Sequence, residues 1–171
     1  MSYYGKTKLE SEKAIRSSGI DFIIVRTNVL YGWGKKVKPN FLLWLLDKLS
    51  AGEKIGIVTD QFNNPTLANN LSACILEMAE KNLTGTFHVG GAEYLSRYDF
   101  ALQVADKFEF DKSLISPVRT ALLAQSAQRP HRGGLKIEKA KKFLKTRLLN
   151  IEEGLELVKR GLGTGGLSPT Q

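Results

Sequence analysis

Tyr4 and Lys8, close to the start of the chain, have the types and the spacing that proton transfer requires. On a helix, residues four positions apart lie on one face, one turn from each other. A phenol is too weak an acid to exchange protons readily at neutral pH, but a neighbouring ammonium favours the phenolate. The pair therefore fits a proton donor and acceptor for the interconversion of a carbonyl and an alcohol. The alternative is an exposed tyrosine beside a solvated lysine.

The rest of the sequence predicts the alternating helices and short strands of an α/β protein. Two capping boxes, Ser96 with Asp99 and Asn150 with Glu153, mark the expected starts of two helices. The apolar run over residues 21–26 is typical of a buried parallel strand. We expect helices over residues 3–17, 40–50, 66–80, 97–108 and 151–160, and strands over residues 21–26, 55–58 and 86–89.

Four further segments follow YGKTKLESE in order along the chain. They are IVRTNVLYG at residues 24–32, DQFNNPT at 60–66, GTFHVGG at 85–91, and Arg129-Pro130 with Gly134-Leu135. A lone Tyr-x-x-x-Lys motif is a weak signal, but the ordered set resembles the extended short-chain dehydrogenase/reductases, and more narrowly their dTDP-4-dehydrorhamnose reductase-like branch. The resemblance runs from Tyr4 to about Leu162. It implies an α/β fold: the C-terminal part of a Rossmann-type NAD(P)-binding fold plus a small α/β substrate-binding lobe.

This resemblance assigns roles to four residues near the cofactor. It implies that Tyr4 donates a proton to the substrate carbonyl and that Lys8 holds the nicotinamide ribose. Thr27 and Asn28 follow the 21–26 strand and are expected to offer hydrogen bonds beside the nicotinamide. Ligands of open α/β sheets bind at this end of the strands. The implied cofactor is NAD or NADP, which supplies the hydride.

The resemblance also implies four residues near a nucleotide-sugar substrate. Val29 stands where the reductases closest to the dTDP-rhamnose pathway carry a tryptophan that packs on the sugar-nucleotide. Asn64 and Thr66 belong to a segment beside the substrate lobe, although Thr66 also suits the N-cap of the next helix. Arg129 lies in a loop and has a guanidinium shaped to grip phosphate, although a loop arginine is often simply exposed.

Neither Gly-x-x-Gly-x-x-Gly nor Gly-x-Gly-x-x-Gly follows a strand in this sequence, although such a turn holds the cofactor pyrophosphate in Rossmann folds. We therefore expect residues 1–162 to form the C-terminal portion of a reductase, followed by a flexible tail over 163–171. We also expect the isolated chain to bind NAD(H) and NADP(H) only weakly. A sheet divided in this way exposes an edge that a second copy or another partner would cover.

The chain carries a net charge of +8 and a single cysteine. A basic surface suits either nucleic acid or the pyrophosphates of a dinucleotide and a nucleotide-sugar, and no nucleic-acid motif accompanies this one. Cys74, which we expect to be buried, fits a reducing cytoplasm, and no apolar run is long enough to span a membrane. His88 and His131 lack the spacing of metal ligands, so we expect no metal site. Basic residues expected mostly on the solvated face of one helix are Lys139, Lys141, Lys142, Lys145 and Arg147.

The sequence thus favours NAD(P)-dependent reduction of a nucleotide-activated 4-keto-sugar. Two alternatives remain open. One is a sugar-nucleotide epimerase or dehydratase of the same fold, against which the short substrate lobe and the DQFNNPT segment argue. The other is a non-catalytic binding subunit, because the regulatory subunit of methionine adenosyltransferase resembles the same branch and also keeps Tyr-x-x-x-Lys.

Overall fold

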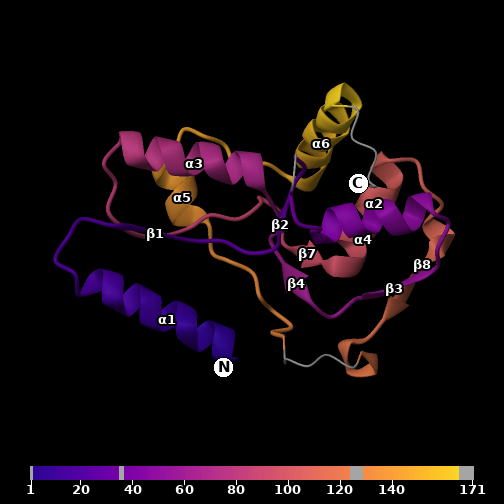
Figure 1. Cartoon of the computed structure of the whole chain (residues 1–171), viewed down its shortest axis with the longest axis horizontal. Coiled ribbons are helices and arrows are strands. Elements are labelled where there is room, and N and C mark those ends of the chain that lie inside the picture. The colour runs from indigo at the N-terminus through magenta and orange to yellow at the C-terminus, as the bar shows by residue number, and fades with distance from the viewer. Residues whose placement is uncertain (1, 35–36, 124–128, 166–171) are drawn as a thin grey trace.

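A computed structural model describes residues 2–34, 37–123 and 129–165 of the chain. It shows a mixed α/β fold in which two groups of elements lie side by side along the long axis (Figure 1). The first group contains α1 (Tyr3–Arg16), β1 (Ile23–Arg26), α3 (Ala68–Glu80), β6 (Gly85–His88) and α5 (Glu138–Phe143). The second contains α2 (Phe41–Ser50), β3 (Ile55–Val58), α4 (Arg97–Lys107), β8 (Ile115–Val118) and α6 (Ile151–Gly165).

The strands pair two by two. In the first group β1 pairs with β6 in parallel, and in the second β3 pairs with β8 in parallel. Where the chain passes between the groups, two-residue strands form one parallel and one antiparallel pair. These are β2 (Leu30–Tyr31) with β5 (Thr66–Leu67), and β4 (Phe62–Asn63) with β7 (Leu95–Ser96). The parallel pairing of β1 confirms that part of the interpretation of its sequence, whereas only Ile24 of this strand is buried.

Each group has its own cluster of buried apolar side chains. The first cluster packs α3 and α5 against β6 and includes Cys74, Met78 and Phe87. The second packs α2, α4 and α6 around β3 and includes Leu45 and Phe100. Full burial of such a side chain stabilises the fold by about 1.5–3 kcal/mol. The two clusters therefore account for the alternation of the chain between the two groups, since helices from distant parts of the sequence complete each core.

The expected helices and strands are confirmed, with most boundaries within two residues of those expected. Both capping boxes form: Ser96 Oγ accepts a hydrogen bond from the Asp99 amide at 3.0 Å, and Asn150 Oδ1 accepts one from the Glu153 amide at 2.8 Å. Helix α6 continues to Gly165 instead of ending at residue 160. The expected tail therefore begins inside this helix, and its residues 166–171 lie outside the described part of the chain.

Two local predictions were wrong. Thr66 is not the N-cap of α3, because it belongs to β5 and pairs with Leu30. Leu67 caps α3, without a side-chain capping bond in the part of the chain that the structure describes. Helix α5 ends at Phe143, so Lys145 and Arg147 lie beyond the helix on which we expected them. In both places a contact with residues distant in the sequence outweighs the local preference for a helix or its cap. Predictions from local sequence cannot include such contacts.

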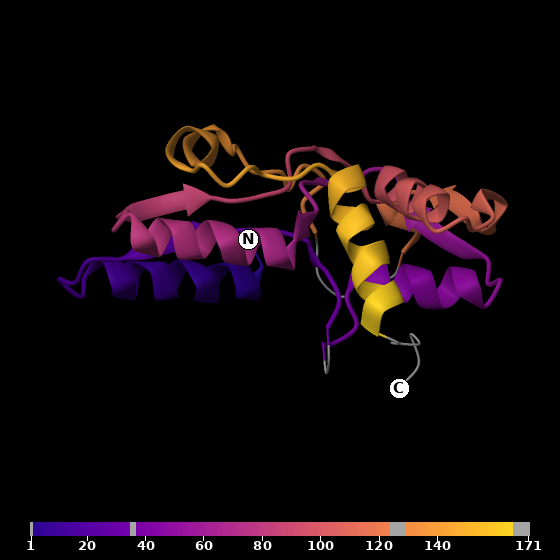
Figure 2. The same cartoon turned by 90° about the horizontal axis from the view of Figure 1, so that it is seen from above.

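Helix α1 is held differently from the others. None of its residues, 3–16, is buried, although the structure describes all of them. It lies along one side of the β1–β6 pair, with α3 and α5 on the other side (Figure 1). In both views its N-terminal end points toward the middle of the molecule, where the two groups meet (Figure 1; Figure 2). Its best shielded large apolar residues, Leu9 and Ile15, remain 37% and 40% exposed, so polar contacts share with them the task of setting its position.

Candidate active site

Tyr4 and Lys8 lie one turn apart on α1, as their spacing predicts. The Lys8 ammonium is 5.5 Å from the centre of the Tyr4 ring, within the range of a cation–π contact. Ser2 begins this helix, and its hydroxyl accepts a hydrogen bond from the Gly5 amide at 3.2 Å. The Tyr4 side chain is 70% exposed, so a substrate can reach its hydroxyl. The arrangement fits a proton donor with a positive charge beside it.

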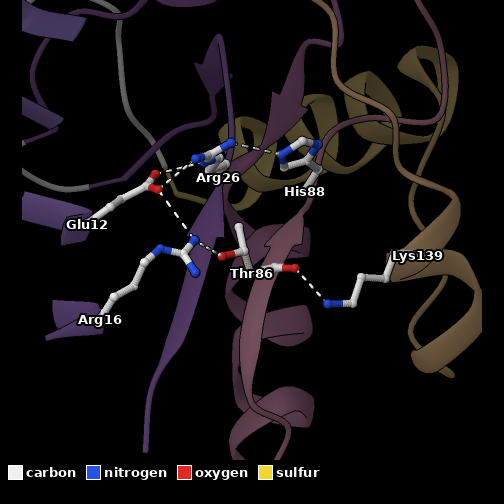
Figure 3. Close-up of polar contacts among 6 residues, drawn as sticks. All are labelled: Glu12, Arg16, Arg26, Thr86, His88 and Lys139. Carbon is white, nitrogen blue, oxygen red and sulfur yellow. Dashed lines mark hydrogen bonds and ion pairs between the residues drawn. The ribbon is translucent and has the colours of Figure 1, made fainter. Parts of the chain in front are cut away.

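The same face of α1 is anchored to the sheet farther along the helix. Residues 4, 8, 12 and 16 recur at the helical spacing. Glu12 contacts Arg26, the last residue of β1, and Arg16 contacts Thr86, which pairs with Ile24 (Figure 3). The helix therefore runs antiparallel to β1, and its start lies toward the carboxyl ends of β1 and β6. This is the end of a parallel pair at which ligands bind.

Thr27 and Asn28 lie at this carboxyl end and have unused hydrogen-bonding groups. Asn28 Nδ2 donates to the Gly133 carbonyl at 2.6 Å. By contrast, Thr27 Oγ1 and Asn28 Oδ1 are buried and have no hydrogen-bond partner among the described residues. Buried polar atoms are nearly always paired, so these two oxygens are available to a ligand that reaches this end of the strands. A hydroxyl and an amide oxygen fit the carboxamide of a nicotinamide, which has both donors and an acceptor.

Val29 has an unusual backbone. Its φ of 41° lies in the left-handed region, which a β-branched residue rarely adopts. Its carbonyl accepts a hydrogen bond from the Thr66 amide at 3.1 Å, so the pairing of β2 with β5 holds this conformation. Val29 lines a narrow crevice with Phe41 and Arg97. The position expected to contact substrate thus adjoins the second group of elements.

Arg129 lines a cavity of about 270 Å³ in that second group. Arg97 lies in the same cavity, and its guanidinium is 4.8 Å from the centre of the Phe41 ring. Burial lowers the pKa of Arg97, and the positive charge of Arg129 lowers it further. The Arg97 Nε is buried without a partner among the described residues. Two arginines that repel each other, one of them with a free donor, make a site that an anion would stabilise.

Sequence reasoning missed three residues of this cavity. Arg97 lies within the Ser96–Asp99 capping box, and its sequence context indicates only the first residue of a helix. Phe41 and Trp44 belong to the helix expected over residues 40–50; their rings stack 5.9 Å apart, and both line the cavity. The sequence offered one indication of this cavity. Trp44 lies on a helix that is followed by a strand containing Gly56, and a large aromatic residue near a glycine can border a pocket as well as a core.

Asn64 and Thr66 bind the backbone of neighbouring segments. Asn64 Nδ2 donates to the carbonyls of Gly91 and Glu93, and its Oδ1 accepts from the Leu135 amide. Thr66 Oγ1 donates to the Asn64 carbonyl and accepts from the Gly91 amide. Both side chains are at most 3% exposed. Because both Asn64 protons are already donated, these residues shape the site from behind, and direct contact with substrate stays a prediction.

Other residues singled out in the sequence have structural contacts. Cys74 is fully buried, and burial raises the pKa of its thiol to about 11. Lys139 donates to the Thr86 carbonyl and lies 4.0 Å from the centre of the Phe87 ring, so it is not simply solvated. His131 Nδ1 contacts the Asp60 carbonyl at 2.9 Å. Among the described residues, no cluster of His, Cys, Asp or Glu is arranged to hold a metal ion, and no helix is long and apolar enough to cross a membrane.

Comparison with known proteins places this geometry in a family. Residues 1–161 match the family described as RmlD substrate binding domain. A probable low-salt glycan biosynthesis reductase of Haloferax volcanii is 31% identical over 136 residues, which cover 78% of this chain and 45% of that protein. Methionine adenosyltransferase 2 subunit beta of Rattus norvegicus is 30% identical over 145 residues, covering 81% of this chain and 43% of that protein.

A solved structure has the same fold. It is dTDP-4-dehydrorhamnose reductase from Bacillus anthracis in complex with NADP, which is 28% identical and superposes with a TM-score of 0.83. The match covers 92% of this chain and 55% of that one, so the chain spans about half the length of the relatives that it matches. This chain therefore belongs to the RmlD substrate-binding domain family and has the fold of the C-terminal portion of Rossmann-type dTDP-4-dehydrorhamnose reductases.

Proposed function

We propose that this chain forms the proton-donating and substrate-binding part of an NAD(P)-dependent reductase of nucleotide-linked 4-keto-sugars. The observation that carries the proposal is the Tyr4–Lys8 pair, which the family match includes. The relatives from Haloferax volcanii and Bacillus anthracis are named as reductases, and the second was solved with NADP. Their names support the reaction class and a nicotinamide cofactor.

The chemistry assigns each residue a separate task. The nicotinamide, when bound, supplies the hydride. Tyr4 donates its hydroxyl proton to the carbonyl oxygen, on which negative charge develops, and the Lys8 ammonium stabilises the phenolate left behind. The unpaired oxygens of Thr27 and Asn28 would orient the carboxamide at the carboxyl end of β1. The alcohol product then leaves, and Tyr4 regains a proton from solvent.

The arginine-lined cavity supports a nucleotide-linked substrate. Arg97 and Arg129 can pair with the two phosphates of a nucleoside diphosphate, since guanidinium groups bind phosphate oxygens two at a time. Phe41 and Trp44 provide aromatic surface for a base or sugar. The cavity, at about 270 Å³, is close to the lower end of ligand sites, roughly 300–1,000 Å³. A free sugar would leave the arginines unpaired.

A chimera tests the proposal directly. This chain would replace the matching 55% of the Bacillus anthracis reductase, and the 171-residue chain would be assayed in parallel. We expect the chimera to oxidise NADPH in the presence of a dTDP-linked 4-keto-sugar and to ignore the free sugar, because the nucleotide contributes binding energy that holds the carbonyl near Tyr4. A chimera that binds NADP but reduces no nucleotide-linked keto-sugar would contradict the proposal.

Arg129→Ala should raise KM for the nucleotide-sugar about tenfold, a loss of roughly 1.4 kcal/mol, with little change in kcat. The physical reason is that a phosphate contact is similar in the ground state and the transition state. Arg119→Ala is the matched control, because this substitution removes the same charge from an exposed arginine that does not line the cavity. Steady-state kinetics of both variants decide. Equal effects of the two substitutions would mean that net charge, and not a phosphate contact, attracts the substrate.

A second candidate function is that of a non-catalytic subunit. Methionine adenosyltransferase 2 subunit beta is about as similar to this chain as the reductases are. In this case Tyr4 and Lys8 would be present without catalysing a reaction, and the exposed surface of α1 would contact a partner. Sedimentation with a purified methionine adenosyltransferase catalytic subunit separates the two. Formation of a stable complex, together with no reduction of any keto-sugar, would favour the subunit.

A further inference from the structure

Helix α1 carries the proposed proton donor, yet none of its residues is fully buried, and its apolar residues Leu9 and Ile15 are 37% and 40% exposed. Its strongest contact with the sheet is the ion pair of Glu12 and Arg26 (Figure 3). Arg26 Nε donates to Glu12 Oε1 at 2.7 Å, and Nη2 donates to Oε2 at 2.6 Å. The Glu12 side chain is only 17% exposed. Two parallel, charge-assisted bonds define both distance and orientation, which a single bond does not.

Neighbouring contacts extend this pair across both strands. Arg16 Nη2 donates to Thr86 Oγ1 at 2.5 Å and lies 3.7 Å from Glu12 Oε2. Arg26 Nη1 lies 3.5 Å from His88 Nε2 on β6. The helix is thus registered on β1 and β6 together.

Geometry links this anchor to Tyr4 and Lys8. Four helical residues advance about 6 Å, and two strand residues advance roughly 6–7 Å. Glu12 is level with Arg26, so Lys8 is level with the residues that follow β1, and Tyr4 lies one turn beyond. A shift or tilt of α1 would therefore move the phenol relative to the carboxyl end of β1, where the oxygens of Thr27 and Asn28 lie.

We propose that Glu12 and Arg26 are a positioning pair that sets the placement of Tyr4 and Lys8 over the carboxyl ends of β1 and β6. The inference rests on the proposed reductase function for its catalytic consequence, but not for its structural part. Another pair on the same helix shows the contrast. Glu10 and Lys13 form an ion pair at 2.8 Å whose side chains are 67% and 59% exposed, and such a pair contributes little.

The first arm of the test measures the position of α1 in the full 171-residue chain, without any need for activity. Spin labels at Lys6→Cys on α1 and Glu80→Cys on α3 report the distance between the helices, since both sites are exposed and the native Cys74 is buried. We expect Glu12→Gln to broaden and shift the distance distribution, and Glu10→Gln to leave it unchanged. An unchanged distribution in Glu12→Gln would overturn the proposal, whether or not the protein is a reductase.

The second arm measures kinetics in the chimera. Misplacement of a catalytic group by about 1 Å can cost up to about 100-fold in rate, so Glu12→Gln should lower kcat on that scale. KM for the nucleotide-sugar should stay the same, because the arginine-lined cavity lies in the other group of elements. Arg26→Lys keeps the positive charge but cannot form the two parallel hydrogen bonds to Glu12. It should retain more activity than Arg26→Gln.

A double-mutant cycle separates a pair from two independent residues. If Glu12 and Arg26 act together, the Glu12→Gln/Arg26→Gln variant should lose no more activity than either single variant. A loss of activity in the double variant equal to the product of the two single losses would overturn the proposal, as would a wild-type kcat in Glu12→Gln. Circular dichroism of each variant confirms that the fold persists. If the wild-type chimera proves inactive, the proposed function fails while the spin-label distances still decide the positioning role.

Discussion

Tyr4→Phe should lower kcat for keto-sugar reduction by about 10²–10⁴-fold, the usual contribution of a positioned general acid. The substitution removes only the hydroxyl and its transferable proton. The ring remains, so the contact with Lys8 remains, and the binding of NADP and of the nucleotide-sugar should change little. The measurement is steady-state NADPH oxidation by the chimera, with cofactor affinity followed by titration calorimetry. Lys8→Ala should instead weaken both turnover and cofactor binding, since the ammonium serves both.

The neighbouring tyrosine provides a matched control for this prediction. Tyr3 is 82% exposed on the same helix, and Tyr3→Phe removes the same hydroxyl from a different face. It should therefore retain the wild-type kcat. Turnover by Tyr4→Phe near that of wild type, or an equal loss in Tyr3→Phe, would show that Tyr4 is not the acid.

Gly91→Ala should destabilise the fold by about 3 kcal/mol or more, at the upper end of the cost of overpacking. A Cβ at this position would lie 2.0 Å from the Pro65 carbonyl oxygen, which belongs to the backbone and cannot rotate away. Relief of the clash would pull the Gly91 amide from Thr66 Oγ1 and its carbonyl from Asn64 Nδ2. The buried amide and carbonyl of Gly91 would then both lose their partners, which adds to the cost. Urea denaturation followed by circular dichroism measures the effect.

Gly163→Ala is the control for this second prediction. Gly163 lies in α6, and a Cβ there meets no atom of the described residues within 4 Å. Alanine favours a helix over glycine by up to about 1 kcal/mol, so this variant should be as stable as wild type or slightly more stable. If Gly91→Ala unfolded at the same urea concentration as Gly163→Ala, the close approach of residues 65 and 91 would not be a constraint on the fold.

The identity of the main elements follows from local sequence. The capping residues Ser96 and Asn150 mark helix starts by hydrogen bonds within three residues, so no distant contact is needed to place them. The apolar run of β1 likewise indicates a parallel strand, whereas its burial depends on what packs against it, and only Ile24 is buried. The spacing of Tyr4 and Lys8 determines that they share a face of α1, because four residues always make about one turn.

The site as a whole depends on contacts that local sequence does not record. Arg97 and Arg129 line one cavity together with residues of β3, and no spacing rule relates positions so far apart in the sequence. Thr66 joins β5 because Leu30 is available as its partner, and this pairing outweighs its preference for an N-cap. Sequence by itself determined which residues can do chemistry here, through their types and helical spacing. Only the tertiary structure decided where α1 rests, because Glu12 and Arg26 are 14 positions apart and meet only when the helix folds back along β1.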